Sequence, residues 1–134
     1  MLYLEKESNM KKVISTNKAP SAIGPYNQAI LSNNTLYCSG QIAINAETGN
    51  IVIDNITNET TQVMKNIHEV LKAADMDFSN VVKSTIFMKN MNDYAKINKV
   101  YSTFFSEKPP AREAVQVSVL PKNVNIEISV IAVK

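Results

Sequence analysis

Two charged side chains, Arg112 and Glu127, carry most of the chemical information in this sequence. Arg112 follows a proline pair in PPAREAVQVSVLP (109–121), and Glu127 lies in the strand-like NIEISVIAV (125–133). The two prolines stiffen the approach to the arginine because each ring fixes its own φ and restricts the preceding residue. A guanidinium matches a carboxylate with two parallel hydrogen bonds, and a partly buried carboxyl group has a raised pKa that suits acid–base work. Together they predict a small carboxylate ligand and are consistent with the hydrolysis of a small, already reactive acid.

Each of these residues also has a plainer interpretation. Arg112 could be a solvated charge beside a turn, since most arginines are exposed. Glu127 could be an exposed strand glutamate, because edge strands often carry charge. The residue pattern alone leaves both alternatives open.

Other catalytic classes lack the residues that they need. The chain holds one histidine, His68, and one cysteine, Cys38, which with no paired acidic spacing form no zinc or iron cluster. Its three glycines form no phosphate-binding loop, and His68 falls on the outer flank of a predicted helix, a poor place for a buried base. The 14 basic and 12 acidic residues are scattered, with no basic stripe. We expect no metal cluster, no nucleotide cofactor and no nucleic-acid partner.

The totals of the chain fit one globular domain. Its 134 residues are 45% hydrophobic and 19% charged, which is enough to bury a core. A single cysteine excludes an intrachain disulfide and suits a reducing compartment, and no apolar run is long enough for a signal peptide or a membrane span. We expect a cytoplasmic protein with no membrane association. Because Met10 is a second methionine, residues 1–9 are interpreted as an N-terminal extension or upstream start, and residues 10–134 as the domain.

Hydrophobic periodicity predicts the elements that must position Arg112 and Glu127. Alternation predicts strands, and apolar residues at helical spacing predict two amphipathic helices, the first with Thr57 or Asn58 as its N-cap. Cys38 then falls on the core side of its strand. The predicted strands are 13–14, two runs within 29–44 joined at Asn33–Asn34, 81–88, 114–120 and 126–133, and the predicted helices lie within 54–75 and 92–105.

This pattern predicts an α+β fold with two helices on one face of a mostly antiparallel sheet of about six strands. Two helices cannot cover both faces, so we expect a homo-oligomer to bury the second one. Glu127 is placed on that second face. The other residues assigned to it are Ala114, Gln116, Ser118, Ser129 and Ile131.

Four segments, in the same order across about residues 12–133, resemble the RidA/YjgF family of reactive-intermediate deaminases. They are APSAIGPYNQA (19–29), YCSGQIAINAETGNIV (37–52), VVKSTIFMKNMNDYAKINKVYSTFF (81–105) and PPAREAVQVSVLPKNVNIEISVIAV (109–133). The resemblance implies a chorismate-mutase-like subunit in a trimeric, barrel-like assembly with a cleft at each subunit interface. It also implies cofactor-free hydrolysis of 2-imino acids, such as 2-iminobutanoate and 2-iminopropanoate formed from enamines, to 2-keto acids and ammonia.

The resemblance further implies roles for individual residues. Arg112 would bind the substrate carboxylate, and Glu127 would orient or activate the attacking water. Tyr26 would line the cleft. The same pocket would include Ser39, Asn98 and the backbone of Ala114, the last near the imine nitrogen.

Three positions depart from the usual pattern of that family. Glu113 and Ala114 follow the arginine, where many relatives have a small residue and then a cysteine. The absence of that cysteine argues against thiol chemistry at the site. Glu113 either points away from Arg112 or weakens the binding of an anionic substrate. Asp75 replaces a glycine that usually follows the first helix, which leaves the geometry of that loop open.

Two other functions are kept beside imine hydrolysis. A trimer that binds a keto acid or similar metabolite without turnover would use the same arginine in a regulatory role. Ribonuclease or translation-inhibitor activity, a label attached to parts of the family, has weak support because paired acid–base groups, a metal site and a basic surface are missing from the pattern.

Overall fold

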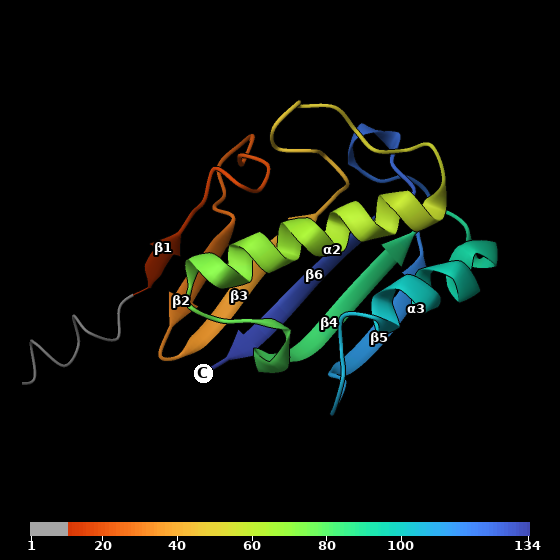
Figure 1. Ribbon diagram of the computed structural model, residues 1–134. Helices are drawn as coiled ribbons and strands as arrows, with labels where there is room; N and C mark the ends of the chain where they lie inside the picture. Colours follow the sequence, from red (N-terminus) through yellow and green to blue (C-terminus); the bar gives the residue numbers. More distant parts are fainter. Residues whose placement is uncertain (1–10) are drawn as a thin grey trace, which may run out of the picture.

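A six-stranded mixed sheet with two helices across one face forms residues 11–134, the part of the chain that the computed structural model describes (Figure 1). The interpretation of residues 1–9 and of Met10 as a start lies outside the described residues. The strands are β1 (Lys12–Ile14), β2 (Ala29–Ser32), β3 (Thr35–Gln41), β4 (Val81–Met88), β5 (Ala111–Gln116) and β6 (Ile126–Val133). The helices are α2 (Ile56–Ala73) and α3 (Tyr94–Ser102), with short 3-10 turns at Phe78–Asn80, Met91–Asp93 and Pro121–Asn123.

The strand order β1-β2-β3-β6-β4-β5 places the last strand of the chain in the middle of the sheet. All pairs are antiparallel except β4 and β5, which run parallel and are connected through α3. The hairpin between β2 and β3 turns at Asn33 and Asn34, whose φ values of 51° and 71° are those that asparagine tolerates in such a turn. The predicted fold class is confirmed.

Both helices pack on the same face of the sheet and bury its inward side chains (Figure 1). The core-facing positions of β4 and β6 alternate with positions on the opposite face, as strand geometry requires. Cys38 is buried in the same core, and burial raises the pKa of its thiol to about 12, so it is a packing residue. The buried inward residues of β4 and β6 are Val81, Ser84, Ile86, Met88, Ile126, Ile128, Val130 and Ala132.

The prediction for the fifth strand was wrong in its bounds and in its faces. β5 begins three residues earlier than expected, directly after the proline pair, and ends at Gln116. Its parallel pairing with β4 sets Ala114 opposite Ile86 and Gln116 opposite Met88, so both lie on the helix side and not on the second face. Ser118 lies beyond the strand. Ser129 and Ile131 do lie on the second face, because they alternate with the buried residues of β6.

The N-cap of α2 also differs from the prediction. The side chain of Asn55, and not Thr57 or Asn58, accepts a hydrogen bond from the backbone N–H of Asn58 at 2.8 Å. An N-cap side chain bonds the N–H two or three positions ahead, so the true cap lies before the first helical residue. Neither α2 nor α3, the two α-helices of residues 11–134, combines the length and the apolar character that a membrane crossing requires.

The end of α2 explains the loop that the sequence left open. Asp75 has a φ of 57°, in the left-handed region, and its N–H donates to the carbonyl of Lys72 while that of Met76 donates to Leu71. Glycine is the preferred residue for this cap, and an acidic side chain at a helix C-terminus is unfavourable.

We predict that Asp75→Gly stabilises the protein by about 1 kcal/mol, because it relieves the left-handed backbone and removes the misplaced charge. Urea unfolding at one fixed protein concentration measures the change. Asp75→Asn, which removes the charge and keeps a side chain, should gain less. A lower stability of the glycine variant would contradict this description of the cap.

Candidate functional site

The guanidinium of Arg112 is held between β5 and α3. Its Nη1 donates to Oδ1 of Asn98 at 2.7 Å, and its Nη2 donates to the hydroxyl of Tyr94 at 2.8 Å. Its central carbon lies 5.6 Å from the ring centre of Tyr94 and 5.1 Å from that of Tyr101, within the range of cation–π attraction. Arg112 is therefore half-buried and fixed in its plane, unlike a solvated charge beside a turn.

A cavity of about 380 Å³ opens beside this guanidinium. An arginine carries more N–H donors than the two bonds to Asn98 and Tyr94 use, so it can still present donors to an anion in the cavity. The two tyrosines beside the guanidinium have shifted pKa values. The hydrogen bond with Asn98 and the charge of Arg112 lower the pKa of Tyr94, whereas burial raises the pKa of Tyr101. The cavity is lined by Asn98, Tyr101, Ser102, Phe105, Pro109, Pro110 and Arg112.

Glu127 lies on the opposite face of the sheet, in a second and smaller cavity of about 120 Å³. The residue is half-buried, and this burial raises the pKa of its carboxyl group. Tyr26, Gly40 and Lys122 line the same cavity, Lys122 from the turn before β6. A carboxyl group with a raised pKa is suited to exchanging a proton with a bound water.

The loop that carries Tyr26 is organised by the buried side chain of Gln28. Its Nε2 donates to the carbonyls of Thr16 at 3.0 Å and Pro20 at 2.8 Å, and its Oε1 accepts from the N–H of Thr16 at 2.7 Å. Ser39 secures the same loop to β3, because its hydroxyl donates to the carbonyl of Asn27 at 2.6 Å. The loop therefore holds Tyr26 in the lining of the Glu127 cavity.

The predicted site residues thus form two groups in one chain. Arg112 contacts Asn98 on the helix side, and Tyr26 shares a cavity with Glu127 on the other side. The lining of neither cavity includes Ser39 or Ala114. The residue types were chosen from the sequence, but the separation of the two groups was not predicted.

The sequence reasoning missed three further members of these groups. Tyr94 and Tyr101 flank Asn98 at intervals of four and three along α3, and that spacing places all three on one helix face. This signal was available in the sequence. Gly40 was missed as well, because its neighbour Glu127 is far away along the chain.

The structure answers the question that Glu113 raised. Its register places it opposite Thr85, on the face of β5 away from Arg112. Its Oε2 accepts from the hydroxyl of Thr85 at 3.0 Å, and its Oε1 lies 3.2 Å from Nζ of Lys83. The bonds with Lys83 and Thr85 lower the pKa of this carboxyl group. Within the chain, Glu113 points away from the guanidinium.

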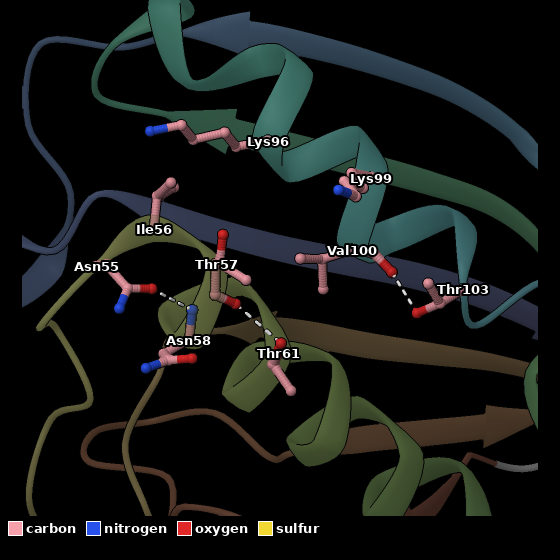
Figure 2. A pocket seen from close by; sticks show the side chains of 9 residues that line it. All are labelled: Asn55, Ile56, Thr57, Asn58, Thr61, Lys96, Lys99, Val100 and Thr103. Carbon is pink, nitrogen blue, oxygen red and sulfur yellow. Dashed lines mark hydrogen bonds between the residues drawn. The ribbon is translucent and has the colours of Figure 1, made fainter.

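A larger cavity of about 770 Å³, between the start of α2 and α3, contains none of the predicted site residues (Figure 2). Two lysines, Lys96 and Lys99, border it, and two of the polar side chains in its lining, Asn55 and Thr61, are bonded within α2 or to its first turn. Figure 2 shows two of these bonds, from the N–H of Asn58 to Asn55 and from the hydroxyl of Thr61 to the carbonyl of Thr57. This cavity therefore receives no functional assignment.

Residues 16–134 match the family model described as Endoribonuclease L-PSP, the family of RidA and YjgF. The chain belongs to this family. A RidA-family relative from mouse, named 2-iminobutanoate/2-iminopropanoate deaminase, is 46% identical over 127 residues, which cover 95% of this chain and 94% of the mouse protein.

Solved structures of the RidA family share the fold described above. YyfA of Yersinia pestis, a Rid-family protein of unknown function, has a TM-score of 0.91 and 48% identity, covering 93% of this chain and 100% of YyfA. TdcF of Escherichia coli, solved with bound serine, has a TM-score of 0.88 and 38% identity, covering 92% of this chain and 98% of TdcF.

The ion pair between Glu113 and Lys83 should affect the stability of the protein at acid pH. Because its folded-state pKa is lowered, the pair stabilises the fold above the ordinary glutamate pKa of 4.5, and this stabilisation is lost as the pH falls through the lowered value. Lys83→Met should raise the pKa of Glu113, measured by ¹³C NMR of the carboxyl group. Lys83→Met should lower the stability of the protein at neutral pH. This destabilisation should be smaller at pH values below the titration of Glu113.

The matched control is Lys65→Met, which removes an exposed lysine from α2, outside the contacts of Glu113. If both variants leave the Glu113 titration at the same midpoint, the ion pair does not form in solution.

Proposed function

We propose that this protein hydrolyses small 2-imino acids to 2-keto acids and ammonia, in clefts shared between the subunits of a homotrimer. The observation that carries the proposal is the braced guanidinium of Arg112, which faces a cavity with donors to spare. Relatives 46% identical over most of the chain are named 2-iminobutanoate/2-iminopropanoate deaminase, which supports this substrate class.

Arg112 binds the substrate carboxylate. Its planar fork gives two hydrogen bonds and a fixed orientation, which a lysine ammonium cannot reproduce. Asn98 and Tyr94 hold the fork before the substrate arrives, so little ordering is needed on binding. The serine in TdcF, also a small carboxylate with a nitrogen on the adjacent carbon, is consistent with such a ligand.

The trimer brings the two groups of residues together. Within one chain Arg112 and Glu127 lie on opposite faces of the sheet, but three subunits can place the helix-side edge of one beside the outward face of the next. That outward face has apolar side chains to cover, among them Tyr37 and Val115, which are 51% and 41% exposed. The shared cleft then contains Arg112 and Asn98 of one subunit, and Tyr26, Ser39 and Glu127 of its neighbour.

The chemistry asks little of the protein because a protonated imine is already electrophilic. Water attacks the imine carbon while Glu127 accepts a proton from it, which forms a carbinolamine. Glu127 returns this proton to the amino nitrogen, and the C–N bond breaks with its electron pair leaving on nitrogen. The hydroxyl gives its proton to Glu127 as the carbonyl of the keto acid forms, and this proton passes to the departing ammonia. The net change from the protonated imine consumes one water and releases one ammonium ion, that is, ammonia and a proton.

The backbone of Ala114 lies near the imine nitrogen in this arrangement. Arg112, two residues before Ala114 in β5, fixes the carboxylate of the substrate, so the imine nitrogen lies beside the strand. We place the reaction in the cytoplasm, beside the pyridoxal-phosphate dehydratases that release enamines, because the one cysteine is buried and free.

We predict that Arg112→Lys lowers kcat/KM for imine hydrolysis by about a hundredfold, because the point charge of lysine loses the two-bond orientation. The imine is generated by an amino-acid oxidase or by threonine dehydratase, and the measurement is the rate of keto-acid release together with the imine trapped by semicarbazide.

The control for this measurement is Lys99→Gln. It removes a positive charge from α3 at the cavity between α2 and α3, which has no assigned function, and it should keep the wild-type rate. Full activity of the lysine variant would exclude the proposed role of Arg112.

A metabolite-binding trimer without turnover is the second candidate, favoured by the bound serine of TdcF. Binding of 2-ketobutyrate in a wild-type protein that does not hydrolyse imine would select it. The description of the family model keeps ribonuclease activity as a third candidate. RNA cleavage that survives both Arg112→Ala and further purification would revive it.

A further inference from the structure

We propose that Gly40 is a positioning residue that seats the carboxyl group of Glu127 against the backbone of β3. The inference rests on the role of Glu127 in the proposed function and assigns the residue that sets its position. It concerns the smaller cavity, where Gly40 and Glu127 lie together.

The space at Gly40 is filled by Glu127 itself. A Cβ atom added to Gly40 would lie 2.8 Å from Cδ, 2.9 Å from Oε2 and 3.0 Å from Cγ of Glu127. Non-bonded carbon atoms pack best about 3.5–4.0 Å apart, so a methyl group and the present carboxyl position exclude each other. The carboxyl group rests directly on the glycine.

Backbone conformation does not account for this glycine. Gly24 and Gly49 have φ values of 142° and 76°, which other residues rarely adopt. Gly40 is outside that region, so a larger residue could take up its backbone angles. What Gly40 supplies is therefore room for the neighbouring side chain.

The backbone next to Gly40 is held by contacts of the preceding residue. It lies where the register between β3 and β6 shifts, between Cys38 and Gln41. The preceding residue, Ser39, is fixed to the Tyr26 loop by its N–H, which donates to the carbonyl of Gln28 at 2.9 Å, and by its hydroxyl. The flexible end of Glu127 must move instead, which costs the fold little.

The titratable groups that share the cavity with Glu127 are Tyr26, from the loop before β2, and Lys122, from the turn before β6. Gln41 comes from β3, and Phe87 is the β4 neighbour in register. Burial is the cause that raises the pKa of Glu127, so a carboxyl group displaced toward solvent should titrate closer to 4.5.

The test combines Gly40→Ala, Glu127→Gln and the double variant. For imine hydrolysis, Gly40→Ala should lower kcat by at least about tenfold, as loss of a positioned acid–base group does, with KM nearly unchanged because Arg112 is intact. The double variant should be no worse than Glu127→Gln alone, since both changes remove one function. Gly49→Ala is the control for loss of a glycine away from this cavity. Its added methyl group meets open space, and its φ of 76° strains only the local backbone, so it should lose some stability and keep wild-type kcat.

A second readout does not need activity. The ¹³C carboxyl resonance of Glu127 is identified by its disappearance in Glu127→Gln, and its titration midpoint is compared between the wild type and Gly40→Ala. A midpoint that moves in Gly40→Ala but not in Gly49→Ala supports the seat, and an unchanged midpoint overturns it. If the midpoint moves in Gly40→Ala while kcat stays constant, the seat stands and the acid–base role of Glu127 fails. If the wild type hydrolyses no imine, the proposed function fails and the midpoint alone decides whether the seat stands.

Discussion

The alternation of side chains along a strand is the constraint on which this molecule depends. Arg112 pairs in register with the buried Ser84 of β4, and Glu127 pairs with Phe87 of the same strand, three residues further on. Because successive residues of β4 face opposite sides, the two charged groups lie on opposite faces of one sheet. A single chain therefore holds two incomplete sites, and the active cleft that we propose needs a second chain.

Each half of the site is held by its own part of the fold. The carboxylate-binding half depends on α3, where Tyr94, Asn98 and Tyr101 present one helix face to the guanidinium. The acid–base half depends on β3 and the loop organised by Gln28. In the reaction that we propose, these halves supply one carboxylate-binding group and one acid–base group, which is little, because a protonated imine is already electrophilic.

Local signals predicted most of the fold. The Asn33–Asn34 turn and the strands at 81–88 and 126–133 could be read from turn residues and alternation, because those features depend on neighbours in the sequence. The faces of β5 could not be predicted in this way. Val115 is apolar, which suggests a core position, and yet it lies on the outward side of the sheet. Only the pairing with β4, a strand well before it in the chain, fixes which side Arg112 takes.

The candidate site was predictable to the same extent. Arg112 and Glu127 stand out by residue type, and the helical spacing around Asn98 could have added Tyr94 and Tyr101. The need for Gly40 depends on a contact between β3 and β6 at a register shift, which no local pattern reports. Sequence reasoning therefore selected the two candidate groups, and the structure was needed to show what holds them and what separates them.

Subunit complementation tests the central claim of a shared cleft most directly. Arg112→Ala and Glu127→Gln subunits are unfolded, mixed in equal amounts and reassembled, and imine hydrolysis is compared with that of each variant treated alone. If each cleft takes its arginine from one subunit and its glutamate from the next, random mixing restores about a quarter of the clefts and a similar share of wild-type activity. If the mixed trimers are no more active than the separate variants, both groups act within one chain or not together, and the account is wrong.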